Sequence, residues 1–494
     1  MTEQDGQKLS RRDFGKTAAL GIGGLALAGL DPAKAVAKVP DKWDQEADVV
    51  VVGAGAAGLS AAAFLSAADK NVIVLEKTPI MGGSSLICGG ALAFAGTDMQ
   101  TAENIKDSNE LFYKDLMTVG ENVNTPYLVK AYLDNQLDTY HWLKGSGIKF
   151  SKVAVSSGMS VPRAHYVVPA EVIKTLSDNA KSKGAQIQPN TAATRLVQDD
   201  QGQIRGVLAQ RGTRKISYGA RRGVVLASGG FALNKELLAK FVPPMAKAKA
   251  MVGLGCQGDG LRMAWAFGAD IRDTPYIKAT FGFSLEPDSG QDRAYVYYSG
   301  AIIVNKQGRR FVNESISYKL VGDAALQQTD AIGFQIFDST IRASAAKNPQ
   351  VAPVDDLARK NRFYVADTVQ ELAQKAGIPA NALEGTIRDY NANVEKGIDP
   401  QFGRTTLVAS YGKPVKIEKA PFYAYPSTAV IIATYGGILI NEKAQVVNVF
   451  GEVIPNLYAA GEITGGFHGA AYMTGSAFGK ALVFGRIAGK NLSA

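Results

Sequence analysis

The sequence has very little cysteine and histidine. Its 494 residues include two cysteines, Cys88 and Cys256, and three histidines, His141, His165 and His468. Neither cysteine belongs to a Cys-x-x-Cys pair, which argues against a cysteine-ligated iron–sulfur cluster and against a haem held by Cys-x-x-Cys-His. The histidines are too few and too scattered to predict a metal site. A disulfide between the two cysteines stays open.

The sequence also lacks a long basic run, a nucleic-acid-binding motif and an internal repeat. Its 54 Lys and Arg residues exceed its 45 Asp and Glu residues, and the net charge of +9 is spread along the chain. This pattern is typical of a solvated basic surface, so we expect no nucleic-acid partner. The 46% hydrophobic and 20% charged residues are ordinary for a globular protein, and the length allows two or three domains.

The apolar run near the N-terminus is too short to cross a bilayer. It covers about 14 residues, whereas a spanning helix needs about 20. It follows the pair Arg11-Arg12 and precedes small residues at Ala35 and Ala37. This pattern predicts a twin-arginine signal peptide over residues 1–37 and export to the periplasm by the twin-arginine translocase. That compartment has no NAD(P)H pool, so we expect a cytochrome c or a quinone-linked protein as the electron partner.

A glycine-rich turn follows the next apolar run. Residues 48–53 read as a buried parallel strand, Gly53-Ala54-Gly55-Ala56-Ala57-Gly58 as a turn into an Ala-rich helix, and Val72–Leu75 as a second strand ending at Glu76. We expect Gly53 to make the turn, Gly55 to let a pyrophosphate approach, Gly58 to let the helix meet the strand, and Glu76 to bind the ribose. A Rossmann-like α/β domain is the prediction.

Downstream segments favour FAD over NAD. The strand at 222–226 leads to the pair Gly229-Gly230, and the strand at 456–460 leads to Gly461-Glu462. Gly258-Asp259-Gly260 and Thr474-Gly475-Ser476-Ala477 each read as the start of a helix. A helix start aimed at a flavin would stabilise the reduced, anionic ring.

The order of these segments resembles the fumarate reductase / succinate dehydrogenase flavoprotein superfamily over nearly all of residues 46–494. The segments are VVVVGAGAAGLSAA, EKTPIMGGSS, GVVLASGGF, GDG, YGGILIN, NLYAAGEITGG and GSAFGKALVFGRIAG. The resemblance implies a split Rossmann-like FAD-binding domain at 46–272 and 424–494 and an inserted α+β capping domain at 273–423. We interpret Pro421–Pro426 as the linker that returns from the cap. Because no His follows Gly83, we expect the FAD to be bound noncovalently.

The glycine turn and the resemblance together predict a set of cofactor contacts. These residues are Gly53, Gly55, Ala56, Ala57, Gly58, Glu76, Lys77, Gly82, Gly83, Ser84, Ser85, Gly89, Gly90, Ser228, Gly229, Asp259, Gly436, Gly461, Glu462, His468, Gly475, Ser476 and Ala477.

The substrate positions differ from those of the fumarate reductases in this superfamily. The resemblance places the two Arg and two His that hold a dicarboxylate at Tyr318, Tyr472, Thr280 and Ala433. A dicarboxylate buried without cationic partners is costly, so fumarate is disfavoured as the substrate. Tyr318 together with Tyr472-Met473-Thr474-Gly475 is similar to 3-ketosteroid dehydrogenases, particularly the Δ4-(5α) type. That similarity implies that Tyr318 moves a proton and that Tyr472 and Thr474 hold the carbonyl.

A phenol suits proton donation at neutral pH, because its pKa is about 10. Acting as a base, Tyr318 would need a lowered pKa or a relay, for which Tyr166, Tyr297 and Tyr298 all stay open. Arg163 and His165 resemble an Arg-Ala-His stretch in members of the superfamily and are further site candidates.

Three functions stay open. The first is an exported FAD-dependent oxidoreductase that exchanges hydride between flavin N5 and a C=C bond beside the carbonyl of a neutral, 3-ketosteroid-like enone. The second is a respiratory reductase of an unsaturated carboxylate, such as acrylate or an aryl-acrylate, fed by a separate cytochrome c. Its single cationic contact would come from Arg163, Lys278 or Lys319. The third is a flavin electron-transfer subunit without catalysis.

Overall fold

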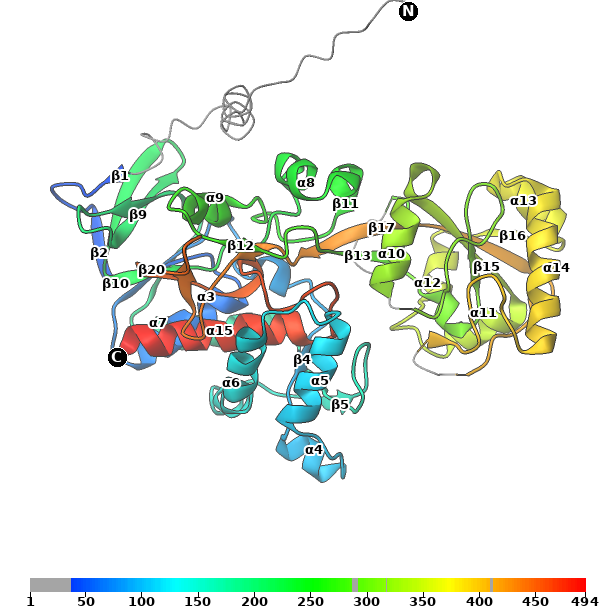
Figure 1. Cartoon of the computed structure of the whole chain (residues 1–494), viewed down its shortest axis with the longest axis horizontal. Coiled ribbons are helices and arrows are strands. Elements are labelled where there is room, and N and C mark those ends of the chain that lie inside the picture. The colour runs from blue at the N-terminus through cyan, green and yellow to red at the C-terminus, as the bar shows by residue number, and fades with distance from the viewer. Residues whose placement is uncertain (1–36, 287–291, 317, 409–411) are drawn as a thin grey trace, which may run out of the picture.

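The computed structural model describes residues 37–286, 292–316, 318–408 and 412–494, which form two lobes (Figure 1). Apart from Ala37, the predicted signal peptide lies outside the described residues. Within the described ranges, no helix is both long enough and apolar enough to span a membrane.

The larger lobe is built on a nine-stranded sheet. Four consecutive parallel pairs give the order β20, β10, β2, β3, β7, and β1 and β8 form a further parallel pair. The long strand β10 also pairs with β9, antiparallel, through its first half. The strands are β1 (Ala37–Lys38), β2 (Gln45–Val52), β3 (Val72–Leu75), β7 (Gln186–Gln188), β8 (Ala192–Gln198), β9 (Ile204–Arg211), β10 (Arg214–Leu226), β19 (Gln445–Val447) and β20 (Val453–Ala459).

Helices and short strands surround this sheet. Helix α3 follows β2 and packs against both α15 and α7. It begins at Ala56, inside the segment 53–58 that we predict as the turn. The elements are α3 (Ala56–Ala67), β4 (Ala91–Ala93), α4 (Asp98–Ala102), α5 (Asn109–Val119), α6 (Pro126–Gly145), β5 (Lys152–Ala154), β6 (Ala164–Tyr166), α7 (Pro169–Ser182), α8 (Lys235–Phe241), β11 (Lys249–Ala250), α9 (Asp259–Trp265), β12 (Ile271–Arg272), β18 (Gly437–Ile438) and α15 (Ser476–Ser493).

The smaller lobe has helices and a mostly antiparallel sheet around its own hydrophobic core. Strand β17 lies between β15 on one side and β13 and β16 on the other. The elements are β13 (Ile277–Ser284), β14 (Ile302–Val304), α10 (Tyr318–Leu326), β15 (Ile332–Asp338), α11 (Ser339–Ala346), α12 (Val354–Arg359), β16 (Tyr364–Ala366), α13 (Val369–Ala376), α14 (Ala380–Lys396) and β17 (Phe422–Thr434).

Strands β13 and β17 run from one lobe into the other (Figure 1). Ile277 and Ile431 belong to the core of the larger lobe, whereas Phe281 and Tyr425 belong to the core of the smaller one. The predicted boundary at 272/273 falls just before β13, and that at 423/424 falls inside β17. The exact division of the chain into domains stays a prediction.

The interpretation of Pro421–Pro426 as a linker is wrong. Residues from Phe422 onward form β17, and Phe334 of β15 lies opposite Pro426. On its other side, β17 pairs with β16 up to Ala424 and with β13 from Ser427 onward. Pro426 therefore falls in the gap between these two neighbours, where a missing N–H group removes no ladder bond on that side.

Candidate active site

The glycine turn has the predicted backbone geometry. Gly53 has a φ of +109°, and a Cβ there would lie 2.4 Å from the Ala227 carbonyl oxygen. A Cβ on Gly58 would lie 1.9 Å from the Gly53 oxygen, so only glycine lets α3 meet the strand. On Gly55 the nearest atom would be 3.8 Å away, at Gly82. The protein thus leaves open the position at which we expect the pyrophosphate.

Three helices in this lobe begin on a glycine. Gly55, Gly258 and Gly475 are the N-caps of α3, α9 and α15, and none of these helices has a side-chain cap. The first N–H groups of a helix have no partner within the helix, and the helix dipole favours negative charge there. Helices α3 and α15 therefore present suitable donors for phosphates and for an anionic flavin ring.

The ends of the neighbouring strands bring more of the predicted cofactor residues together. The Glu76 carboxylate accepts hydrogen bonds from the Ala54 N–H at 3.0 Å and from Thr78. The Lys77 ammonium lies 2.6 Å from Asp259, which joins the end of β3 to the start of α9. Ser228 has a buried hydroxyl without a hydrogen-bond partner among the described residues. Such an atom is expected where a polar ligand completes the site.

The Gly82–Ser85 segment is held beside the same turn. The Ser85 hydroxyl accepts a hydrogen bond from the Ala56 N–H, and the Ser84 hydroxyl accepts one from the Gly253 N–H. Cys256 lies 3.3 Å from the Ser84 hydroxyl, and both cysteines of the chain are free thiols. The disulfide that the sequence leaves open is therefore not formed.

At several other predicted cofactor positions, close packing explains why the residue is glycine. A Cβ on Gly90 would lie 2.3 Å from the Val167 oxygen, and one on Gly436 would lie 2.6 Å from Thr274. Gly461 faces Ala57 of α3, where a Cβ would be 2.8 Å from the Ala57 methyl group. Gly83 and Gly89 have nothing within 4 Å of such a Cβ. Contact of these residues with the cofactor stays a prediction.

The two predicted catalytic tyrosines converge on one lysine. Tyr318 is the first residue of α10 in the smaller lobe, and Tyr472 lies in the larger lobe before α15. The Lys278 ammonium lies 3.5 Å from the ring centroid of Tyr472 and 5.7 Å from that of Tyr318. Both lobes thus contribute to one cluster of polar side chains.

Each tyrosine is held by its neighbours. The Tyr472 hydroxyl accepts a hydrogen bond of 3.0 Å from the Gly475 N–H, at the N-cap of α15. The ring of Tyr318 stacks on Tyr295, with centroids 6.4 Å apart, and Tyr295 stacks on Tyr298. Tyr298 also meets the ring of Tyr297, so these two proposed relay residues lie on the Tyr318 side. Tyr166 lies near Tyr472 instead.

Burial controls the protonation of this cluster. It raises the pKa of Tyr318 well above that of an ordinary phenol, and the neighbouring phenols Tyr472 and Tyr435 raise it further. It also raises the pKa of Tyr472. Burial lowers the pKa of Lys278 to about 7, and the nearby Arg293 contributes to the lowering. Both phenols therefore keep their protons at neutral pH.

His468 lies beside Tyr472 and Tyr435. This position is compatible with the predicted contact to the flavin or the substrate. Its ring is 5.6 Å from that of Tyr472 and 5.2 Å from that of Tyr435, and its Nδ1 lies 3.4 Å from the Ser476 hydroxyl. Burial and the nearby lysines lower the pKa of His468 well below its ordinary value. Tyr435 has a buried hydroxyl without a partner in the described ranges. It directly follows the Ala433-Thr434 motif, which was the available sequence signal for it.

Three other predicted site residues have structural roles. Arg163 is fully buried and its guanidinium binds Asp107 at 2.6 Å and Asp115 at 2.8 Å. His165 contacts the Thr97 hydroxyl with one ring nitrogen and the Arg163 carbonyl with the other. The Lys319 ammonium pairs with Asp323 at 2.7 Å.

Since their charges are already balanced, Arg163 and Lys319 are poor partners for a substrate carboxylate. Neither Arg163 nor Lys319 is therefore retained as the cationic contact for a carboxylate. The carboxylates that bind Arg163 lie 48 and 56 positions away in the chain, so the local motif does not reveal them.

The remaining family positions are small or neutral. Thr280 is buried on β13, and its hydroxyl has no partner among the described side chains. Ala433 on β17 lies directly opposite Lys278 in the strand ladder. The Thr474 N–H donates to the Ser157 carbonyl. The role of the Thr474 hydroxyl at a carbonyl stays a prediction.

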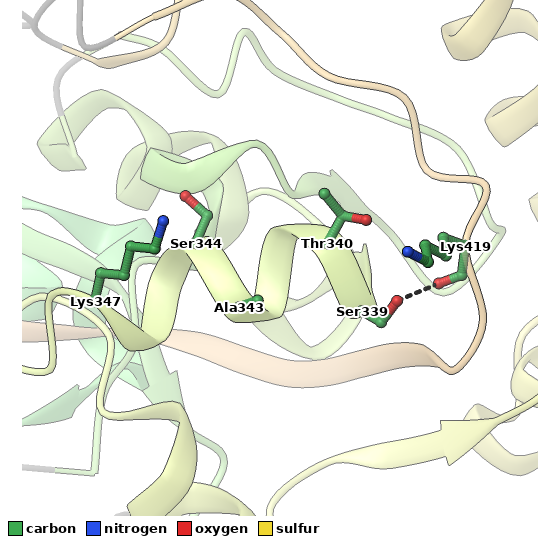
Figure 2. A pocket seen from close by; sticks show the side chains of 6 residues that line it. All are labelled: Ser339, Thr340, Ala343, Ser344, Lys347 and Lys419. Carbon is green, nitrogen blue, oxygen red and sulfur yellow. Dashed lines mark hydrogen bonds between the residues drawn. The ribbon is translucent and has the colours of Figure 1, made fainter.

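A separate pocket lies on the smaller lobe (Figure 2). It has a volume of about 430 Å³ and lies over α11, where the Ser339 hydroxyl donates to the Lys419 carbonyl at 2.9 Å. Its lining residues are Ser339, Thr340, Ala343, Ser344, Lys347 and Lys419. None of these was predicted for the active site, so we do not assign the substrate to this pocket.

Residues 48–477 match the family described as FAD binding domain. The chain belongs to this family. Membership confirms the resemblance seen in the sequence, and it confirms FAD as the cofactor. The protein is an FAD-dependent oxidoreductase, as predicted.

Known relatives include a fumarate reductase (cytochrome) of Shewanella frigidimarina. It is 36% identical over 420 residues, which cover 84% of this chain and 71% of the relative. The open conformation of a flavocytochrome c3 fumarate reductase has a TM-score of 0.79 at 30% identity, covering 99% of this chain and 82% of the other. This likeness confirms the α/β fold with a Rossmann-like domain and a capping domain.

A ketosteroid enzyme is similar in structure as well. The 3-ketosteroid Δ4-(5α)-dehydrogenase of Rhodococcus jostii, solved with 4-androstene-3,17-dione, has a TM-score of 0.76 at 26% identity. The match covers 93% of this chain and 99% of the other. Both groups named in the sequence-based resemblance are therefore represented among proteins of this fold.

Proposed function

We propose that the protein reduces a C=C bond conjugated to the carbonyl or carboxyl group of a small molecule. In this proposal Tyr318 donates a proton to one carbon and Tyr472 holds the oxygen. The observation that carries it is the convergence of the two protonated tyrosines, one from each lobe, on Lys278. FAD, when bound and reduced, supplies the hydride for the other carbon.

The side chains support the reductive direction. Because burial raises the pKa of Tyr318, the phenol holds its proton through the neutral range and can donate it to a developing carbanion. The Tyr472 hydroxyl accepts the Gly475 N–H and keeps its own O–H free to donate to the substrate oxygen. Donation toward an oxygen that gains charge in the transition state is an oxyanion-type stabilisation.

Two substrate classes fit this arrangement. A neutral enone is supported by the similarity to the ketosteroid dehydrogenase and by the tyrosines at positions where a fumarate reductase has arginines. An unsaturated carboxylate is supported by the similarity to a fumarate reductase and by the cation Lys278. The converging tyrosines argue against the third alternative, an electron-transfer subunit without catalysis, which needs no proton donor.

The test is the rate at which substrate reoxidises the dithionite-reduced flavin in a stopped-flow experiment. For Tyr318→Phe we expect this rate to fall by about 100-fold to 10⁴-fold, the usual contribution of a positioned acid. The flavin content and its absorption spectrum should stay as in the wild type. Tyr390→Phe is the matched control, because it removes another buried, unpartnered hydroxyl of the smaller lobe. Wild-type rates in Tyr318→Phe would remove Tyr318 from the mechanism.

The electron partner is proposed on the chemistry of the chain. The sequence of this protein contains neither a Cys-x-x-Cys-His haem site nor a ligand set for an iron–sulfur cluster. This supports a separate cytochrome c or quinone-linked protein as the electron donor, and the arginine pair near the N-terminus supports a location outside the cytoplasm. Rapid mixing of a reduced c-type cytochrome with the oxidised flavoprotein tests this, and absence of flavin reduction would exclude that donor.

A further inference from the structure

Lys278 has an unusual position for a lysine. Its ammonium lies between the rings of the two catalytic tyrosines, and its side chain is partly buried on β13. In the described part of the chain, no ion pair or hydrogen bond joins it to a carboxylate. By contrast, Arg163 and Lys319 both have carboxylate partners. A partly buried cation without an ion-pair partner is costly, which points to an anion that arrives from outside.

The strand register explains how Lys278 reaches this place. Lys278 of β13 lies directly opposite Ala433 of β17, and the ladder then shifts between Lys278 and Ala279. Cross-strand partners project to the same face of a sheet, so the small Ala433 leaves room for the lysine. Ala433 is also the position at which the sequence resemblance places a substrate-binding His. A cation on β13 therefore lies beside the β17 position at which the resemblance places the His.

We propose that Lys278 binds the carboxylate of the substrate and makes this enzyme selective for unsaturated monocarboxylates. This inference rests on the proposed function and assigns its substrate class. One ammonium balances one carboxylate, whereas the second carboxylate of a dicarboxylate would find neutral side chains at Thr280 and Ala433. A neutral enone would leave the lysine without an anion.

The groups around Lys278 allow its charge to depend on pH. Its charge is affected by Cys88, Arg293 and Glu462, besides the two tyrosines in contact with it. Burial raises the pKa of Cys88 and of Glu462 above their ordinary values. A pKa of about 7 for Lys278 means that the free enzyme loses this cation as the pH rises through neutrality.

The experiment compares substrates that differ only in charge. trans-Cinnamate and trans-cinnamamide share a C=C bond and a ring, and crotonate and crotonamide form a second pair without the ring. With the wild-type holoenzyme we expect kcat/KM for the carboxylate to exceed that for the amide. In Lys278→Met the ratio of the two kcat/KM values should fall by at least about 100-fold, as for a buried charge pair that loses one partner. Lys278→Arg should recover part of the ratio.

Arg293→Gln is the matched control. Arg293 is the other cation whose charge acts on Lys278, and its guanidinium lies 5.9 Å from the ring of Phe283. We expect its carboxylate-to-amide ratio to stay within about threefold of the wild type, because this variant keeps the Lys278 ammonium and removes only a second charge that acts on it from a distance. Loss of the ratio in Arg293→Gln with retention in Lys278→Met would overturn the proposal.

A binding measurement gives a readout apart from turnover. Calorimetric titration of the oxidised holoenzyme with 3-phenylpropionate, which cannot be reduced, should show a Kd that rises about tenfold per pH unit above about 7. The sign follows because deprotonation of Lys278 removes the cation that binds the anion. The dependence should vanish in Lys278→Met, and a pH-independent Kd in the wild type would contradict the role of Lys278.

The outcomes also separate this inference from the proposed function. If neither pair nor a 3-keto-4-ene steroid reoxidises the reduced flavin, the proposed function fails. If only the amides or the steroid do so, the proposed function stands and carboxylate selection by Lys278 is wrong.

Discussion

At the scale of single residues, the same amino acid can be required for two different physical reasons. Gly55 and Gly58 both belong to the turn before α3. Gly58 faces the backbone of Gly53, whereas Gly55 faces no protein atom closer than 3.8 Å to an added Cβ. Gly55 has a φ of −78°, which any residue adopts. The fold therefore explains why residue 58 is glycine, whereas at Gly55 the predicted pyrophosphate contact supplies the reason.

We accordingly expect Gly55→Ala and Gly58→Ala to fail in different ways. Gly55→Ala should fold normally and lose FAD affinity, by at least about tenfold, because the methyl group meets the pyrophosphate. Gly58→Ala should lower the free energy of unfolding of the apoprotein by roughly 1–3 kcal/mol, as overpacking does. Urea unfolding of both apoproteins, followed by FAD titration, makes the comparison. An unstable Gly55→Ala apoprotein would show that protein packing fixes Gly55 too.

The residue scale also shows where sequence reasoning stops. The turn, its three glycines and the helix starts are local patterns, so the sequence predicts them well. The roles of Arg163 and Lys278 depend on partners far away in the chain. Arg163 is neutralised by carboxylates of another segment, while Lys278 gains its place only through the β13–β17 register. No local motif distinguishes the two cations.

At the scale of elements, β17 and α15 show the same contrast. Helix α15 begins at the predicted Thr474–Ala477 segment, because Gly475 takes a φ of +85° that ends the preceding loop. The segment Pro421–Pro426, which we interpret from the sequence as a linker, belongs to β17 from Phe422 onward. Only the arrangement of β15, β16 and β13 around β17 shows why a strand tolerates Pro426.

The uncapped start of α15 leads to a prediction about the flavin potential. Its first turn contains no acidic residue, and Ala477 is a cofactor contact by prediction. Ala477→Asp should lower the midpoint potential by about 10–40 mV, because an added anion destabilises the reduced, anionic flavin by roughly 0.3–2 kcal/mol. Spectroelectrochemical titration measures the shift. Ala477→Asn is the control, because asparagine has the shape of aspartate without its charge. An equal potential shift in both variants would contradict the electrostatic explanation.

At the scale of the whole molecule, two hydrophobic cores are joined through β13 and β17. The smaller core contains its own buried ion cluster. Glu314 is fully buried and binds Arg310 at 2.7 Å, and Arg310 in turn binds Asp399 at 2.9 Å. Arg404 lies 3.4 Å from Glu314 and donates to the Tyr297 carbonyl, close to the rings that hold Tyr318. The cluster therefore stabilises the lobe that carries the proposed proton donor.

From these separate cores we expect two calorimetric unfolding transitions. Glu314→Gln leaves buried guanidinium groups without their full charge balance, which costs about 3–5 kcal/mol. For a lobe of roughly 150 residues this should lower the smaller lobe's Tm by about 10 °C.

Added FAD should raise only the transition of the larger lobe, since a ligand stabilises the unit that binds it. Glu384→Gln on the exposed surface of α14 is the control and should move neither transition. A single transition that both Glu314→Gln and FAD displace would mean that β13 and β17 couple the lobes into one cooperative unit, and cap opening would then require deformation of both cores.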